Sequence, residues 1–354
     1  MQIDKTYASE TCSRELLLDS NAPVREAIEL LSRYQHNIVI VTSNSVVVGI
    51  VTDGDVRNAL LSEIDPRSSI TSIMNREFRY AMEGAERSSV EHYMLKEGVA
   101  RLPELNSKGE FLGLYYLTAA ARNNQNTPLL IMAGGYGMRL RPLTETVPKP
   151  MLKISGTPII ERIIVNARAQ GFSKVFISVN YLAHVIEAYL RDGKSFGVEI
   201  VYLHEDSKLG TAGAVKKLDF KGYDDCVVIN GDLVTSMDLT KLVLFHRANS
   251  SAATMAVRMW EDQLKYGVVE FNNNTYISSV EKPVKRYFIN AGIYMLSKEV
   301  RDLVGDGYQD MPSLFDRVKI NGGRAMVYPV LEPWQDIGTH EDFNRIQNAN
   351  SIGN

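Results

Sequence analysis

Between residues 129 and 249, short apolar runs alternate with longer stretches in which apolar residues recur every three or four positions. The runs have the length of buried strands, and the spacing of the stretches is typical of amphipathic helices. The pattern predicts strands at 129–132, 174–179, 198–203 and 225–230, and helices at 158–170, 182–191, from about 212, and at 239–249. Such alternation predicts a mostly parallel sheet covered by helices on both faces, with ligands beyond the carboxyl ends of the strands.

Residues 16–122 contain a second pattern, which occurs twice. Each copy has a polar turn, an amphipathic helix, two strands and a closing helix, and the amphipathic helices are expected at 24–34 and 88–97. Gly49 and Gly113, which begin the last strand of each copy, lie 64 residues apart. Because either copy alone is too small for a core, we expect the two to pack together by pseudo-twofold symmetry.

A short polar segment ending in Pro128 separates the two patterns and predicts a domain boundary. We therefore expect a smaller domain at 1–122, with repeats at about 10–62 and 66–122, a linker at 123–128, and a larger domain at 129–354.

Composition narrows the class of protein. The 354 residues carry a net charge of −3 with both signs mixed, so no basic surface for nucleic acid is expected. Cys12 and Cys226 are far apart, which predicts neither a disulfide framework nor a zinc site and fits a reduced, cytoplasmic location. The N-terminus has no apolar core, and no run reaches about 18 apolar residues, so neither a signal peptide nor a membrane span is expected.

The first strand of the larger domain leads into a glycine-rich loop, Ala133-Gly134-Gly135-Tyr136-Gly137, which is followed by Met138, Arg139, Arg141 and Lys149. Glycines let the backbone N–H groups approach phosphate oxygens, and the nearby cations neutralise phosphate charge. The loop therefore predicts a triphosphate site. The alternative is a tight turn with solvated arginines.

The sequence GGYGMRLRPLT, followed by PKPML at 148–152, resembles the signature of the sugar-1-phosphate nucleotidyltransferases. The likeness covers about residues 128–345 and implies a Rossmann-like α/β fold with a mixed, mostly parallel sheet. It also implies that the nucleotide contacts Ala133, Gly134, Gly135, Gly137, Met138 and Arg139, and that Arg139 and Lys149 are catalytic.

An acidic residue, Asp232, ends the predicted strand at 225–230 and is a candidate ligand for a hard divalent cation. The segment Trp334–Thr339 resembles the family motif in which a second aspartate, here Asp336, completes the metal site. The resemblance thus implies Mg²⁺ held by Asp232 and Asp336, with Asp232 counted as catalytic. The alternative for Asp232 is an aspartate that caps a helix or turn.

Two further motifs imply the sugar site. Glu281-Lys282-Pro283 resembles the family segment in which the lysine contacts the sugar phosphate and the glutamate a hydroxyl. The segment 290–294 resembles the one that lines the hexose pocket with Asn290 and Gly292. The alternatives are a surface turn for the first motif and a strand edge for the second.

The loop at 209–213, with Gly210 and Thr211, resembles the family loop beside the base and sugar. Glu205 lies five residues before Gly210, where the family often reads the base edge. A carboxylate only accepts hydrogen bonds, and guanine offers two donors on one edge, so Glu205 favours guanine. A solvated or ion-paired glutamate remains the alternative.

The repeat at 16–122 resembles a tandem pair of CBS domains, a smaller α+β unit that commonly binds adenine nucleotides and regulates an attached enzyme. The first copy has the family pattern in Gly49, Thr52 and Asp55, whereas the second has Tyr116 and Ala119 in place of the threonine and aspartate. One adenine-nucleotide site at Thr52 and Asp55 is therefore expected. The alternative is a packing module in which these residues cap a helix starting near Val56.

Together these resemblances imply transfer of a nucleoside monophosphate, with GTP as the expected donor and glucosamine-1-phosphate as the expected acceptor, and release of pyrophosphate. The resemblance points to bacterial enzymes of nonulosonic acid or surface-glycan pathways and to a homo-oligomer built through the CBS pair. Mannose-1-phosphate as the sugar, and thymidylyl, uridylyl or cytidylyl transfer, remain alternatives. A nucleotide sensor without turnover is the alternative from another class.

Overall fold

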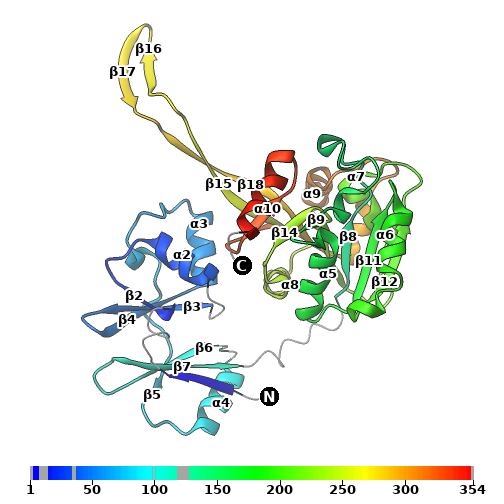
Figure 1. Cartoon of the computed structure of the whole chain (residues 1–354). Coiled ribbons are helices and arrows are strands. Elements are labelled where there is room, and N and C mark those ends of the chain that lie inside the picture. The colour runs from blue at the N-terminus through cyan, green and yellow to red at the C-terminus, as the bar shows by residue number, and fades with distance from the viewer. Residues whose placement is uncertain are drawn as a thin grey trace. The chain divides into compact units, whose positions relative to one another are not determined.

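The computed structural model describes residues 3–7, 15–33, 37–97, 99, 101–117 and 127–351. The chain forms two compact units, residues 1–123 and 124–354 (Figure 1). Most of the predicted linker, together with Cys12 and Ala119, lies outside the described residues. None of the described helices is long and apolar enough to cross a bilayer.

The smaller unit contains two sheets of the same construction. In the first, β2 (Leu17–Asp19) pairs in parallel with β3 (Ile38–Ser43), which pairs antiparallel with β4 (Val46–Thr52). In the second, β5 (Ala81–Met82), β6 (Arg101–Leu105) and β7 (Phe111–Leu117) pair in the same way, and β1 (Ile3–Tyr7) adds to β7. The helices are α2 (Val24–Arg33), α3 (Asp53–Leu61), the 3-10 turn η1 (Ile70–Ser72) and α4 (Arg87–Lys96).

The two predicted repeats match in register. Gly49 lies opposite Val41 and Gly113 opposite Glu104, and each ladder shifts register directly beyond that pair. One buried cluster combines Leu16, Ile38 and Ile40 with Leu105 and Leu114. Because this cluster draws side chains from both halves, neither half has this core alone, as the size argument predicted.

A seven-stranded sheet forms the centre of the larger unit, in the order β12-β11-β8-β13-β18-β15-β19. Its strands are β8 (Leu129–Met132), β11 (Lys174–Val179), β12 (Glu199–His204), β13 (Asp225–Asn230), β15 (Ala253–Gln263), β18 (Val284–Ser297) and β19 (Ala325–Pro329). All neighbours are parallel except β18, which is antiparallel to β13 and β15. The predicted mixed, mostly parallel sheet is confirmed. In the segment 290–294, Tyr294 is paired with both β13 and β15, whereas Asn290 is paired with β15.

Helices cover both faces of this sheet. One buried cluster includes residues of α5 (Ile159–Ala169), α6 (Ala183–Leu190), α8 (Leu239–Ala248) and α10 (His340–Ser351). The other includes residues of α7 (Gly210–Gly213), η6 (Ala214–Lys217), η7 (Lys298–Leu303) and α9 (Met311–Ile320). In β8, Leu129 and Ile131 join the first cluster and Leu130 the second. This strand is therefore buried on both sides, which explains its continuous apolar run.

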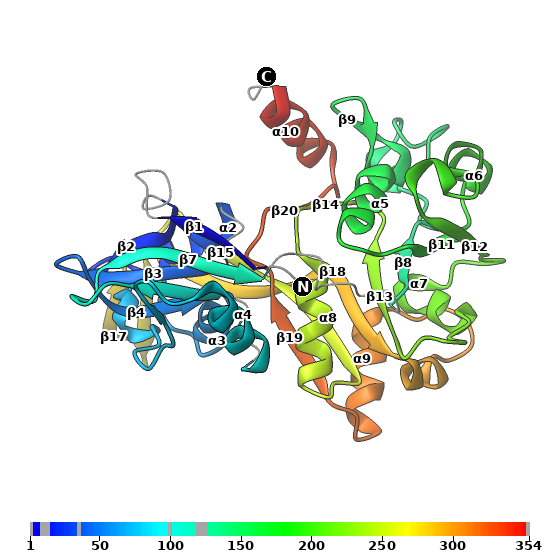
Figure 2. The same cartoon turned by 90° about the horizontal axis from the view of Figure 1, so that it is seen from below.

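Shorter elements shape the edge of the sheet. They are η3 (Met138–Leu140), η4 (Lys149–Met151), β9 (Lys153–Ile154), β10 (Thr157–Pro158), η5 (Lys194–Phe196), β14 (Leu233–Thr235) and β20 (Trp334–Asp336). Figure 2 shows β14 and β20 running together toward α10, and they form a two-stranded antiparallel pair.

A long ribbon leaves the sheet. Beyond their sheet-bound halves, β15 and β18 stay paired with each other from Trp260 opposite Tyr287 to Gln263 opposite Val284. A hairpin of β16 (Val268–Asn272) and β17 (Thr275–Val280) lies at the tip (Figure 1). We call residues 260–288 the arm. Nearly all of its residues are exposed.

A buried histidine ties α8 to the sheet. Nδ1 of His246 lies 2.8 Å from Thr254 Oγ1, and Nε2 lies 3.0 Å from Ser297 Oγ. Burial lowers the pKa of His246 to about 4 from its ordinary value of 6.5. The ring is therefore neutral in the folded protein at neutral pH.

We expect the free energy of unfolding of the larger unit to fall by about 2 kcal/mol between pH 7 and pH 5 through this one residue. The unfolded chain takes up a proton below about pH 6.5, whereas folded His246 resists protonation down to about pH 4. Urea unfolding followed by tryptophan fluorescence would measure the loss, because both tryptophans, Trp260 and Trp334, lie in this unit. His246→Gln should flatten the slope and exposed His184→Gln should not. An equal slope in all three proteins would contradict the assignment.

Candidate functional site

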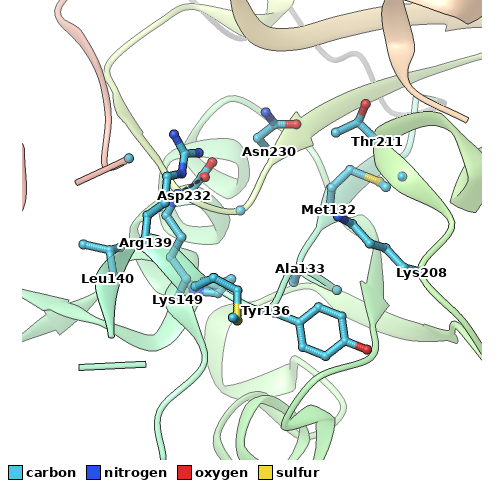
Figure 3. A pocket seen from close by; sticks show the side chains of 18 of the residues that line it. Met132, Ala133, Tyr136, Arg139, Leu140, Lys149, Lys208, Thr211, Asn230 and Asp232 are labelled. Atoms are coloured by element: carbon cyan, nitrogen blue, oxygen red, sulfur yellow. Dashed lines mark hydrogen bonds and ion pairs between the residues drawn. The ribbon is translucent and has the colours of Figure 1, made fainter. Parts of the chain in front are cut away.

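A cavity of about 420 Å³ opens at the carboxyl edge of the sheet, where β8 runs into the glycine-rich loop (Figure 3). Gly137 has φ of +60°, and Thr144 Oγ1 donates to its carbonyl at 2.8 Å. A side chain at this position would be strained and would contact Thr144, so glycine suits the turn. The loop then enters η3, which places Arg139 at the cavity.

Every predicted nucleotide contact lines this cavity, as do Lys149 and Asp232. Its lining comprises Met132, Ala133, Gly134, Gly135, Tyr136, Gly137, Met138, Arg139, Leu140, Lys149, Pro150, Glu205, Lys208, Gly210, Thr211, Asn230, Gly231, Asp232, Tyr308 and Gly338. The structure thus brings together segments that lie far apart in the sequence.

Two carboxylates and a lysine lie together at the cavity, where Lys149 and Asp232 are part of the lining and Asp336 is not. Lys149 Nζ forms an ion pair with Asp232 Oδ2 and lies 3.8 Å from Asp336 Oδ1. Pairing of β14 with β20 places Leu233 opposite Asp336, which brings the two aspartates together. Burial, and then the charge of Asp232, raise the pKa of Asp336. A cation bound between the two carboxylates would offset both the burial of Asp336 and its repulsion by Asp232.

The donor set fits a magnesium ion. Asp232 Oδ1 and Asp336 Oδ1 are both buried and have no hydrogen-bond partner within the described chain. Magnesium is commonly bound through one or two carboxylates, with waters and substrate phosphates as the other ligands. The described residues contain no cluster of three ligating side chains. Phosphate oxygens and waters would therefore complete the coordination of an ion held here.

Glu205 is buried and fixed beside the glycine-rich loop. The Ser178 hydroxyl donates to its Oε1, and the Leu209 N–H donates to Oε2 at 3.2 Å. A Cβ on Gly134 would lie 3.0 Å from Oε1, so the carboxylate packs against the Gly134 backbone. The alternative of a solvated glutamate is wrong, because Glu205 is a buried, hydrogen-bonded acceptor that lines the cavity.

Gly210 and Thr211 join the cavity to α9. Gly210 has φ of +79°, and a Cβ there would lie 2.3 Å from the carbonyl oxygen of Gln309. Thr211 Oγ1 accepts a hydrogen bond from the Met311 N–H at 2.9 Å. Both residues therefore hold this wall of the cavity in place.

Nine lining residues were not predicted from the sequence, and four of these, Tyr136, Lys208, Asn230 and Tyr308, have polar or aromatic side chains. The rings of Tyr136 and Tyr181 lie 5.3 Å apart, and Lys208 Nζ lies 5.5 Å from the ring centre of Tyr308. Asn230 Oδ1 is buried without a hydrogen-bond partner in the described chain. Tyr136 and Lys208 lie next to motif residues and Asn230 ends a predicted strand, so position could have indicated these three. No local signal marks Tyr308.

The predicted sugar residues are divided between two places. Asn290 accepts from the Gly292 N–H at 2.9 Å, and a Cβ on Gly292 would lie 2.6 Å from Asn230 Nδ2. Gly292 therefore borders the cavity through Asn230. Glu281 and Lys282 are exposed on the arm and line no part of the cavity. A single copy of the chain does not assemble the sugar site that the motifs predict.

A half-buried arginine, Arg258, holds the segment that carries Asp336. Arg258 Nη1 donates to the carbonyl oxygens of Val330, Leu331 and Glu332 at 3.0, 3.2 and 3.1 Å. Trp334 Nε1 donates to the Ala291 carbonyl at 2.9 Å. These bonds fix the turn directly before β20 and so position Asp336.

A second cavity, of about 350 Å³, lies within the smaller unit. It is lined by Asn37, Ile38, Ile50, Thr52, Asn75, Glu77, Phe78, Arg79, Val99 and Arg101. Thr52 and Asp55 form a reciprocal capping box on α3, which begins at Asp53 rather than near Val56. Asp55 does not line the cavity. The capping alternative describes the observed contacts of Asp55, and of the two predicted ligand residues only Thr52 lines this cavity.

Comparisons with known proteins agree with this architecture. The family model described as nucleotidyl transferase matches residues 129–351, and the CBS domain model matches residues 9–62. A UTP--glucose-1-phosphate uridylyltransferase of Synechocystis is 35% identical over 235 residues, covering 60% of this chain and 61% of the relative. A mannose-1-phosphate guanylyltransferase of Mycobacterium tuberculosis is 31% identical over 229 residues, covering 61% and 62%. The match thus spans about three fifths of the length of these curated relatives.

One solved structure is that of HddC from Yersinia pseudotuberculosis complexed with GMP-PN. It is 26% identical, with a TM-score of 0.50, over 63% of this chain and 99% of that chain.

We expect Gly210→Ala to lower the free energy of unfolding by about 3 kcal/mol, because it combines a strained φ with a clash against Gln309. Gly156→Ala is the matched control. Gly156 has φ of +85° and open space around its Cβ, so it should cost only about 1 kcal/mol. Urea unfolding of both variants would measure the difference. An equal loss of unfolding free energy in both would show that the Gln309 backbone moves away from the added Cβ at no cost.

Proposed function

This chain belongs to the nucleotidyl transferase family, and we propose that it transfers GMP from GTP to glucosamine-1-phosphate, with release of pyrophosphate. The observation that carries the proposal is one cavity that combines a glycine-rich loop with Arg139, Lys149 and Asp232, and a second carboxylate, Asp336, lies 3.8 Å from Lys149. The relatives are sugar-1-phosphate nucleotidyltransferases. The base and the sugar are our own inference.

The reaction is an in-line displacement at the α-phosphorus. An oxygen of the sugar phosphate attacks, and pyrophosphate leaves. Because the nucleophile is already an anion, no general base is needed, and catalysis consists of positioning and charge neutralisation. Arg139, after the loop, would stabilise the developing charge on pyrophosphate, and Lys149 would lie near the α-phosphate. Magnesium, held by Asp232 and Asp336, would supply Lewis-acid stabilisation of the phosphate oxygens.

The preference for guanine rests on Glu205. Its two oxygens are held beside Gly134 by Ser178 and Leu209, so they present fixed acceptors at the nucleotide end of the cavity. Guanine offers N1–H and the 2-amino group together, which two acceptors complement. The solved relative bound to GMP-PN supports this choice. Uridylyl transfer is the rival, because a uridylyltransferase is among the similar proteins.

The proposed sugar rests on the domain combination. Transferases fused to a CBS pair most resemble enzymes that activate an amino sugar, and mannose-1-phosphate is the main competitor. Asn290 and Gly292 would face the hexose, Lys282 its phosphate and Glu281 a hydroxyl. An adenine nucleotide in the second cavity, beside Thr52, would regulate the enzyme.

We expect Mg²⁺-dependent pyrophosphate release with GTP and glucosamine-1-phosphate to exceed that with dTTP, UTP, CTP or ATP. A parallel series with mannose-1-phosphate identifies the sugar. Glu205→Gln should reduce the preference for GTP, because an amide presents one donor where guanine needs an acceptor. A preference for UTP or dTTP in the wild type would overturn the base assignment. The absence of pyrophosphate release with every substrate pair would favour the alternative of a nucleotide sensor without turnover.

We expect Asp232→Asn to lower kcat by about 10²–10³-fold at saturating Mg²⁺, because the neutral amide weakens charge stabilisation at the phosphates. Asp306→Asn is the control, since Asp306 is almost fully exposed and pairs only with Lys216 at the surface. Steady-state kinetics across a Mg²⁺ series would measure both. A near wild-type rate for Asp232→Asn would refute the metal assignment.

A further inference from the structure

The arm is an unusual surface for a folded protein. Twelve large apolar residues on it are exposed: Trp260, Leu264, Tyr266, Val268, Val269, Phe271, Tyr276, Ile277, Val280, Val284, Tyr287 and Phe288. Tyr266 is 80% exposed and Phe271 is 69% exposed. An isolated two-stranded ribbon is at best marginally stable in water, because it has no core of its own. The arm therefore needs a surface to pack against.

The arm also carries the two predicted sugar-site residues that the cavity lacks. Glu281 and Lys282 lie at its middle, where the base ribbon of β15 and β18 meets the tip hairpin. Lys282 has φ of +46°, a strained conformation for a residue with a side chain. A Cβ on Gly267 would lie 2.7 Å from Glu281 Oε1, so the two strands are closely packed at this joint.

The ribbon holds this joint away from its own cavity. β15 and β18 pair in unbroken register from Val257 opposite Asn290 to Gln263 opposite Val284. At about 3.3 Å per residue, Lys282 lies roughly 25 Å along the arm from Asn290. Folding it back onto the same chain would break this ladder. Figure 1 shows the arm leading out from the sheet.

We propose that the arm docks on the larger unit of a second copy of this chain and brings Lys282 to the sugar-phosphate end of that copy's cavity. The proposal rests on the proposed function for the role of Lys282. It unites the divided sugar site, because the partner's cavity supplies Asn290 and Gly292 while the arm supplies Glu281 and Lys282.

The size and charge of the arm fit a second copy. Its 29 residues, 260–288, are as many as one side of a standard protein interface contains, about 20–30. It has four acidic and four basic residues, so copies of the chain meet without net repulsion from the arm. An exchange of arms about a twofold axis also closes the assembly, since each copy gives one arm and receives one.

Cross-linking tests the docking without any need for activity. Chains labelled with light and heavy nitrogen are unfolded, mixed and refolded, and an amine-reactive cross-linker is added. We expect Lys282 to be joined to Lys208, an exposed residue of the cavity lining, in pairs that mix light and heavy chains. Pairs of one label only, or no such pair, would overturn the proposal.

Matched variants locate the contact. Phe271→Ser should abolish the mixed pairs, because it removes apolar surface from the tip. Ile320→Ser should leave them unchanged, since Ile320 is an equally exposed apolar residue, 81% exposed, elsewhere on the same unit. If both variants keep the mixed cross-linked pairs, or if both variants lose them, docking through the arm is contradicted.

Complementation tests the contribution to the site. Lys282→Ala alone should lower the rate by about 10²-fold. When Lys282→Ala and Asp232→Asn chains are co-expressed with different tags and purified through both, the mixed assembly should regain about half of the wild-type rate, because one of its two sites is intact. The pair Lys149→Met with Asp232→Asn should regain none. An inactive wild type would refute the proposed function, whereas an active wild type without complementation would refute the exchange.

Discussion

The site depends on two like charges being held together at the edge of a parallel sheet. Asp232 and Asp336 repel each other, and burial makes the repulsion worse, as the raised pKa of Asp336 shows. Lys149 offsets part of this through its ion pair with Asp232. The buried Oδ1 atoms of both aspartates have no hydrogen-bond partner in the described chain, which leaves them available to a cation. The rest of the larger unit serves to keep this arrangement in place.

Backbone pairing contributes most to holding Asp232 and Asp336 together. The short ladder between β14 and β20 sets the distance between the two carboxylates, and Arg258 fixes the turn before β20 through three carbonyl groups. On the opposite wall, Glu205 lies against Gly134 and Gly210 against Gln309, where any larger residue would separate the segments. The cavity is thus built from close backbone approaches, with few free side chains.

Much of this could be predicted from the sequence because the signals are local. Strands buried on both faces appear as continuous apolar runs, and the glycine-rich loop after residue 132 carries its phosphate chemistry within a few residues. The pairing of Asp232 with Asp336 was implied by family resemblance alone. Tyr308 was missed because it reaches the cavity only through the packing of the segment before α9. The arm was missed because its alternating pattern is the same as that of a strand in a covered sheet. For Asp55, the same residue type serves a helix cap and a ribose contact, and the coordinates show the cap contacts while the ribose contact stays a prediction.

The pairing of β14 with β20 also has a consequence for the order of events during synthesis. The two carboxylates are 104 residues apart in the sequence. A nascent chain that has passed residue 232 already contains the glycine-rich loop, Lys149 and one carboxylate, but lacks the second until the segment at Trp334–Asp336 leaves the ribosome. Any nucleotide bound by such an intermediate would meet an incomplete metal site. The glycine-rich loop, Lys149 and Asp232 are therefore synthesised first, and the second carboxylate of the pair follows only after a further 104 residues.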